Sequence, residues 1–268
     1  MRGRDVKDIP QALLASLFGS GKGEHALDEE TWQALMGLPL FDGLDAAERL
    51  RLRELATQLL ADKAFSGAGG IEVDDGMATA IAAFAVLPVL NIGYDWYEGW
   101  REIVVYPGEF IYDGEQMDEA GVVHHVRHVR SGEAMLGGPM VLSWQDVEHS
   151  GQGDGFNVVI HEFAHKLDMK NGDANGRPPL HSGIDPEEWA REFQSAYDDL
   201  CRRADGGEET TIAPYATESP AEFFAVFTEY FFEAPDMLEQ EYSAVYGLLM
   251  KFFRQDPLAR LHTAAVAR

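Results

Sequence analysis

The chain has 268 residues, 46% of them hydrophobic, which is typical of a globular protein with a sizeable core. Its 46 acidic side chains outnumber the 21 basic ones and give a formal net charge of -25 at pH 7. This charge disfavours nucleic acid and anionic membrane surfaces as partners, so a partner held by charge should be basic. The single cysteine, Cys201, cannot form an internal disulfide, and we expect a cytoplasmic protein.

The N-terminal region contains a short apolar run at residues 12–18, preceded by basic residues. Two aspartates come before this run and no A-x-A-like cleavage site follows it, so no signal peptide is expected. We interpret residues 1–34 as a weakly docked extension and residues 35–268 as a single domain, since no repeat or linker divides them. The longest apolar run, residues 77–90, is too short to span a bilayer.

The next part of the chain is expected to form two helices followed by three strands. Apolar residues at helical spacing predict a helix over residues 45–62, with Asp45 and Glu48 as a capping pair at its start. Glycines at 67, 69 and 70 interrupt the helical pattern, and the Ala-rich segment 74–87 predicts a helix buried on most sides. Alternating and β-branched residues predict strands at Ile103–Tyr106, Val122–Val129 and Met140–Trp144.

A histidine cluster lies within the second of these strands, at His124, His125 and His128. In a strand, His124 and His128 share one face while His125 points to the other. The two on one face would then lie roughly 13 Å apart, too far for one metal ion. We therefore interpret the cluster as a polar strand face.

The stretch from Asn157 to Asp168 contains the pattern H-E-x-x-H. Its apolar residues recur every three or four positions and form one buried helix face, beside which His161 and His165 lie one turn apart. Two imidazoles so placed can bind one zinc ion, with Glu162 as the base for a metal-activated water. A chance pattern is disfavoured, because burying these groups without a metal or other partners would cost several kcal/mol.

A catalytic zinc site needs a third protein ligand. Asp168 lies about 10 Å along the helix axis from His161, so it should instead hold a ligand imidazole or make a helix-end hydrogen bond. Glu222 is a stronger candidate, because it opens a second long apolar helix. With Ser219 and Pro220 it also fits a capping box, and the spacing does not separate ligand from cap. Weaker candidates for the third ligand are Glu218, Glu229 and Glu233.

The sequence resembles the Mlc titration factor A family of bacterial zinc metallopeptidases over about residues 35–262. The H-E-x-x-H stretch is followed by Tyr215 and, seven residues later, by Glu222, in the pattern Y-A-x-x-x-P-A-E. The first thirty or so residues and the loop 171–182 have no counterpart in this resemblance. Shorter matches follow in the family's order: Leu87–Leu90, Tyr106–Pro107, Ser131–Glu133, Gly138–Pro139, Val141–Asp146, Glu229–Phe232 and Gln255–Leu258.

The resemblance implies one Zn²⁺ per chain, held by His161, His165 and Glu222. It implies Glu162 as general base and Tyr215 as a phenol that supports the tetrahedral intermediate. It also implies a catalytic domain similar to that of anthrax lethal factor. We therefore expect an α+β fold with a zincin-like core, made of a small sheet, the H-E-x-x-H helix and the second ligand helix, with additional N-terminal helices.

Two functions from different classes are consistent with these features. The first is hydrolysis of peptide bonds through a metal-activated water, by aminopeptidase-like or endopeptidase action. The resemblance implies that this activity is linked to the regulation of sugar uptake. The alternative, which the resemblance to this family implies, is a non-proteolytic, acidic binding protein that sequesters a transcriptional repressor. An acidic surface suits such a basic DNA-binding partner. The expected partners are thus a peptide or protein substrate and a repressor, without direct contact to nucleic acid or membrane.

Overall fold

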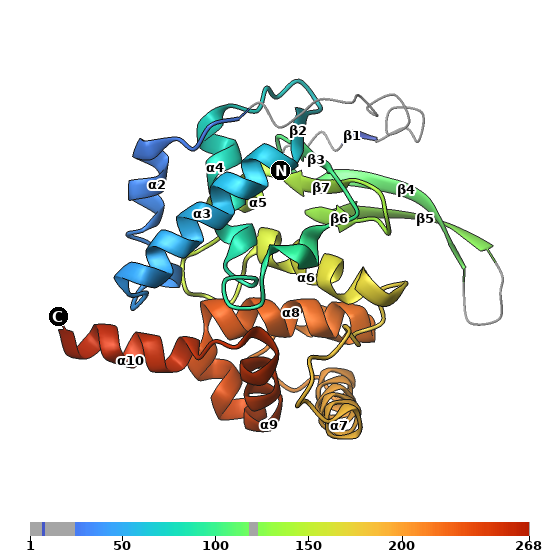
Figure 1. The fold of residues 1–268 in the computed structure, drawn as a ribbon. Coiled ribbons are helices and arrows are strands. Elements are labelled where there is room, and N and C mark those ends of the chain that lie inside the picture. The colour runs from blue at the N-terminus through green and yellow to red at the C-terminus, as the bar shows by residue number, and fades with distance from the viewer. Residues whose placement is uncertain (1–6, 9–24, 118–122, 268) are drawn as a thin grey trace.

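The structure, a computed structural model, describes residues 7–8, 25–117 and 123–267 of the chain. It is a mixed α+β fold in which helices predominate and the strands form two small sheets (Figure 1). The predicted α+β class is therefore confirmed. None of the helices in the described ranges combines the length and hydrophobicity needed to cross a membrane.

The N-terminal helices form one side of the molecule. They are α2 (Glu29–Leu35), α3 (Ala46–Asp62) and α4 (Asp75–Val86), with the 3-10 helices η1 (Pro39–Phe41) and η2 (Tyr94–Tyr97). The predicted capping pair of α3 is present, because the Asp45 side chain accepts from Glu48 N and the Glu48 side chain accepts from Asp45 N. Helix α2 begins within the expected extension, packs against α4 and buries Trp32.

The central sheet has the strand order β2-β3-β7-β6. Its strands are β2 (Ala64–Gly67), β3 (Glu102–Tyr106), β6 (Gly132–Ala134) and β7 (Met140–Ser143). The first three in this order are parallel, whereas β6 runs antiparallel to β7 at the end of the order. Strands β3 and β7 confirm two predicted strands, and both are buried from Ile103 and Met140 onward.

A second sheet has the order β1-β4-β5. Its strands are β1 (Lys7–Asp8), β4 (Phe110–Met117) and β5 (Val123–Arg130). Strand β5 confirms the predicted strand that contains the three histidines. The side chains of His124, His125 and His128 lie outside the described residues, so their interpretation as a polar face stays a prediction.

The remaining helices carry the motifs. They are α5 (Trp144–His149), α6 (Val158–Asp168), α7 (Pro186–Asp205), α8 (Pro220–Glu233), α9 (Pro235–Phe253) and α10 (Pro257–Ala267), with η3 (Met169–Asn171) and η4 (Pro214–Thr217). Helix α6 lies between the central sheet and α8, and α7 and α9 lie beyond α8 (Figure 1).

Helix α6 is buried along its whole length, not on one face as its pattern predicts. The reason is that β6 and β7 pack on one side of it and α8 on another. Phe163 anchors it against two aromatic rings, with centroids 4.8 Å from Tyr97 and 5.5 Å from Trp100. Even Lys166 is buried, where its ammonium donates to the carbonyl of Met135 at 2.6 Å. This packing fixes the histidines on a rigid element.

Candidate metal centre

Helix α6 is held at its first turn by two glutamates of α8. Asn157 is the N-cap residue, and its side-chain oxygen accepts from the backbone N–H of Ile160 at 3.0 Å. The backbone N–H of Asn157 donates to Glu229 at 2.6 Å, and its amide nitrogen donates to Glu233 at 2.7 Å. The start of the motif helix is therefore tied to the neighbouring helix just before the first histidine.

Three donor groups meet where α6 and α8 face each other. His161, His165 and Glu222 each offer a ligand atom, and these atoms lie within 4.8 Å of one another. One oxygen of Glu222, Oε2, lies 3.0 Å from His161 Nε2 and 3.4 Å from His165 Nε2. Ligand atoms bound tetrahedrally to one zinc ion at about 2.1 Å lie about 3.4 Å apart. The donor set of two imidazoles and one carboxylate therefore fits a zinc ion.

The cap and ligand interpretations of Glu222 turn out to be compatible. The side-chain oxygen of Ser219 accepts from the backbone N–H of Glu222 at 3.1 Å, which caps α8. The Glu222 carboxylate is directed at the histidines instead. Burial opposes its ionisation, but the contacts with His161 and His165 outweigh burial and hold the pKa of Glu222 well below its usual value. The backbone N–H of Glu222 takes part in the helix cap, while its carboxylate stays available for a metal.

Glu229 contacts the other side of a candidate ligand. Its Oε1 lies 2.8 Å from His161 Nδ1, and the Glu229 side chain is buried. Burial lowers the pKa of His161, but Glu229 and Glu222 outweigh this effect and raise the pKa well above 6.5. A proton on Nδ1 donated to Glu229 leaves the Nε2 lone pair for a metal, an arrangement common among zinc-bound histidines.

The other acidic residues that were candidates for the third ligand have different surroundings. Glu218 is exposed at the end of η4. Glu233 accepts from the backbone N–H groups of Gly151 and Gly153 at 2.9 and 2.8 Å. Asp168 makes the helix-end interaction rather than a hydrogen bond to an imidazole. It accepts from three successive backbone N–H groups, those of residues 175, 176 and 177, at 2.6 to 2.9 Å.

A cleft of about 330 Å³ opens beside the donor groups. Its wall includes the predicted base Glu162 and the predicted phenol Tyr215. Glu162 is buried against β6, where a Cβ on Gly132 would lie 2.3 Å from its Oε1. The Tyr215 ring is 41% exposed, and its centroid lies 6.0 Å from that of His161. All five predicted site residues therefore lie at one place.

The family described as glucose-regulated metallo-peptidase M90 matches residues 21–254 of the chain. The chain belongs to this family. It is 41% identical over 233 residues to Mlc titration factor A of Yersinia pestis (strain Pestoides F), with 86% of each chain covered. The same values hold for Mlc titration factor A of Yersinia pseudotuberculosis serotype O:1b (strain IP 31758). The predicted family resemblance is confirmed.

Among solved structures, one crystal structure covers 83% of this chain and 93% of its own. It is that of a candidate zinc-binding metallo-peptidase from Bacteroides caccae ATCC 43185, with 15% sequence identity and a TM-score of 0.36.

Sequence reasoning missed several residues that shape the cleft. Gly132, Phe156, Val226 and Tyr230 all line it, and they come from three separate segments: β6, the loop before α6, and α8. The role of Glu229 as a partner of His161 was also missed, although a signal for it exists. Glu222, Glu229 and Glu233 are seven and four residues apart, which places all three on one face of α8.

Proposed function

We propose that this chain is a zinc-dependent peptidase that hydrolyses peptide bonds in the cleft between β6 and α6. One zinc ion per chain would be held by His161, His165 and Glu222. The observation that most supports this is the convergence of these three donors beside the buried carboxylate of Glu162. In this proposal residues 35–268 form one zincin-like domain.

A bound zinc ion would polarise the peptide carbonyl. It would also lower the pKa of water, so that water could lose a proton and attack the carbonyl near pH 7. Glu162 takes the proton of the attacking water and passes it to the leaving amine. Tyr215 donates its phenol hydrogen to the oxyanion that develops on the carbonyl. Glu229 holds His161 in the tautomer and orientation that binding requires.

The strand at the edge of the cleft is suited to bind a peptide in an extended conformation. Strand β6 is the last strand in its sheet and contributes Gly132 to the cleft, next to Ser131. An extended backbone can add to such a strand by main-chain hydrogen bonds, with side chains placed alternately into the cleft and away from it. The apolar surfaces of Phe156, Val226 and Tyr230 favour a substrate with a bulky apolar side chain next to the cleaved bond.

The test is a Glu162→Gln variant, which keeps the shape of the side chain and removes its basicity. We expect this variant to retain one zinc per chain by elemental analysis and to lose hydrolysis of a peptide library. The wild-type cleavage sites in that library distinguish aminopeptidase-like from endopeptidase action. Wild-type rates in the Glu162→Gln variant, or a wild-type chain that binds no zinc, would contradict the proposal.

A second candidate function is the sequestration of a transcriptional repressor, linked to sugar uptake. It is supported by the net charge of -25 and by the relatives named Mlc titration factor A. An acidic surface attracts a basic DNA-binding protein, and the lone Cys201 suits a cytoplasmic setting. The Glu162→Gln variant also separates the two functions, since it should bind the repressor as tightly as the wild type.

A further inference from the structure

A second pocket lies away from the donor groups, between α7, the start of α8 and the loop at residues 175–177. We propose that it binds a carboxylate that carries one large apolar group. Such a ligand is either a free organic acid or the C-terminal residue of a peptide. This site goes beyond the proposed peptidase function, because none of the residues that line it belongs to the candidate metal centre.

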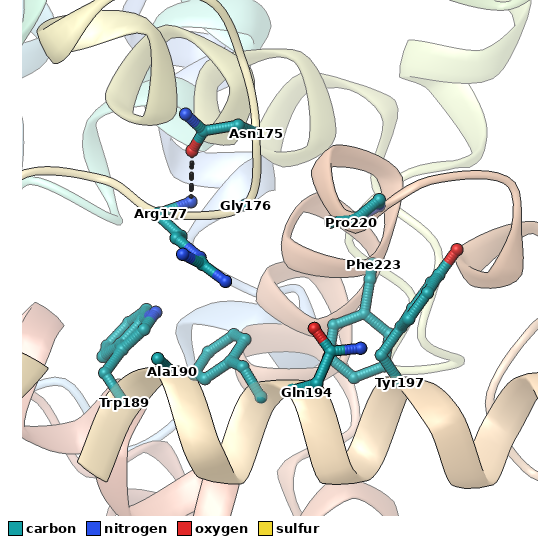
Figure 2. A pocket seen from close by; sticks show the side chains of 10 residues that line it. Asn175, Gly176, Arg177, Trp189, Ala190, Gln194, Tyr197, Pro220 and Phe223 are labelled. Carbon is teal, nitrogen blue, oxygen red and sulfur yellow. Dashed lines mark hydrogen bonds between the residues drawn. The ribbon is translucent and has the colours of Figure 1, made fainter. Parts of the chain in front are cut away.

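The floor of the pocket is aromatic (Figure 2). Trp189 and Phe193 of α7 stack with ring centroids 4.2 Å apart and an interplanar angle of 12°. Phe223 of α8 continues the row, with its centroid 6.1 Å from Phe193 and 5.5 Å from Tyr197. A floor of this kind favours a flat or branched apolar group, which displaces water from the rings when it binds.

Two hydrogen-bond donors at this pocket lack a partner among the described residues. The Arg177 side chain extends from the loop over the pocket toward α7, and it forms no ion pair or hydrogen bond in the described part of the chain (Figure 2). The indole N–H of Trp189 is buried and also has no acceptor there, although the residue is only 1% exposed. A guanidinium and an N–H at one apolar pocket match a ligand with an anionic acceptor.

The loop that carries Arg177 is held rigidly. The Asp168 carboxylate, at the end of α6, accepts from the backbone N–H groups of Asn175, Gly176 and Arg177. Gly176 has φ +76°, and a Cβ there would lie 2.3 Å from the carbonyl oxygen of Pro220. The loop therefore closes on α8 only with glycine at this position. Because the backbone of this loop is already ordered, binding an anion at Arg177 does not have to order the loop.

The size and charge of the pocket narrow the ligand class. Its volume is about 200 Å³, somewhat more than the roughly 150 Å³ cavity that holds a benzene ring. One aromatic or branched side chain with its carboxylate fills this space. The chain as a whole repels anions at a net charge of -25, so the positive charge of Arg177 is needed to bind one.

The test is calorimetric titration of the full-length, zinc-loaded protein with N-acetyl-phenylalanine. The matched probe is N-acetyl-phenylalanine amide, which keeps the ring and removes the negative charge. We expect saturable binding of the acid and binding of the amide that is weaker by about tenfold or more. A short peptide that ends in phenylalanine, with a free or an amidated C-terminus, is titrated in parallel. If N-acetyl-phenylalanine binds more tightly, the ligand is a free organic acid; if the peptide with the free C-terminus does, the ligand is the end of a peptide.

Two variants locate the binding site. Arg177→Gln removes the charge at an exposed position, and Ala190→Leu fills the pocket from α7. Each should weaken binding of the acid by about tenfold or more, while zinc content and peptide hydrolysis stay at wild-type levels. The control is Arg191→Gln on the same helix, whose guanidinium already pairs with Glu192 and lies outside the pocket.

Binding should also persist in the zinc-free protein, because the ligand does not touch the metal centre. The proposal is overturned if neither acid binds, or if the amide binds as tightly as the acid. It is equally overturned if Arg177→Gln binds like the wild type, or if binding disappears with the zinc. These outcomes are independent of hydrolysis, so failure here and failure of the peptidase proposal are distinguishable.

Discussion

The Nδ1 atom of His161 lies 2.8 Å from Glu229 Oε1, while Nε2 of the same ring faces Glu222 at 3.0 Å. One imidazole is thus placed between two carboxylates of α8 that are seven residues apart. With a metal on Nε2, Glu229 would keep the proton on Nδ1 and hold the ring in place. This arrangement makes Glu229 a positioning residue for metal binding even though it is not one of the three proposed ligands.

Replacing Glu229 by Gln should therefore weaken zinc binding by about 10 to 100-fold. Gln keeps the size of the side chain but lacks the charge that favours a proton on Nδ1. The measurement is a chelator competition titration at pH 7. Glu218→Gln is the control, since it removes an exposed carboxylate just before the same helix. Equal zinc affinity in Glu229→Gln and wild type would show that the contact is only structural.

Gly132 should be essential for the position of the base. A Cβ at this residue would lie 2.3 Å from Oε1 and 2.6 Å from Cγ of Glu162, so Gly132→Ala must displace the carboxylate or shift β6. We expect kcat to fall by about 10²-fold, since small displacements of catalytic groups have effects of that size. Zinc content should change little. Gly247→Ala on α9 is the control, because nothing lies within 4 Å of its added carbon. An unchanged kcat in Gly132→Ala would contradict this role for β6.

Glu233 should make stability depend on pH. Burial raises the pKa of Glu233 from 4.5 to about 7, against the opposing effect of three N–H donors from Asn157, Gly151 and Gly153. Between these pH values the folded chain keeps a proton that the unfolded chain has lost. The contribution of Glu233 to stability is therefore present below about pH 4.5 and is lost as pH rises to about 7. The loss amounts to about 3 kcal/mol.

Urea unfolding of the metal-free protein from pH 5 to pH 8 measures this dependence. Glu233→Gln cannot titrate, so the difference in unfolding free energy between wild type and variant should change with pH in the stated direction. Asp236→Asn, at an exposed position on α9, should parallel the wild type. A difference between wild type and Glu233→Gln that stays constant across this range would refute the assignment.

The sequence predicted helices α3, α4, α6 and α8, for a physical reason. In long elements such as α3 and α6, the periodic apolar residues and the capping residues lie within one continuous stretch of sequence. Asp45 and Glu48 could therefore be predicted as a capping pair without a structure. Strands β2 and β6, of four and three residues, have too few positions to show an alternating pattern. Strand β2 also depends on a partner far along the chain, because Ala64 pairs with Glu102 of β3.

In the candidate site, too, local features could be predicted from the sequence, whereas features that depend on packing could not. The histidines one turn apart and Glu162 follow from helix geometry, but the role of Glu222 does not follow from spacing. Its backbone caps α8 while its side chain meets α6, and only the packing of the two helices shows that both uses coexist. The requirement for glycine at Gly132 is likewise invisible in sequence, because it depends on how closely β6 approaches α6.

The last prediction concerns the phenol of Tyr215. Its ring lines the cleft with a centroid 6.0 Å from that of His161, and 41% exposure leaves it accessible to a substrate. As the proposed donor to the developing oxyanion, it acts on a charge that is absent from the ground state. Tyr215→Phe should therefore lower kcat by about 10² to 10³-fold, while KM and zinc content change little.

The competing explanation is that the Tyr215 ring only packs at the entry to α8, in which case Phe would replace it without loss. Tyr230→Phe is the matched control, because Tyr230 also lines the cleft but its hydroxyl already donates to the carbonyl of Thr211 at 3.1 Å. Steady-state kinetics on a cleaved library peptide separate the two explanations. If Tyr215→Phe and Tyr230→Phe both keep wild-type kcat with full zinc content, Tyr215 is not a catalytic residue, and the proposed chemistry rests on the metal ligands and Glu162.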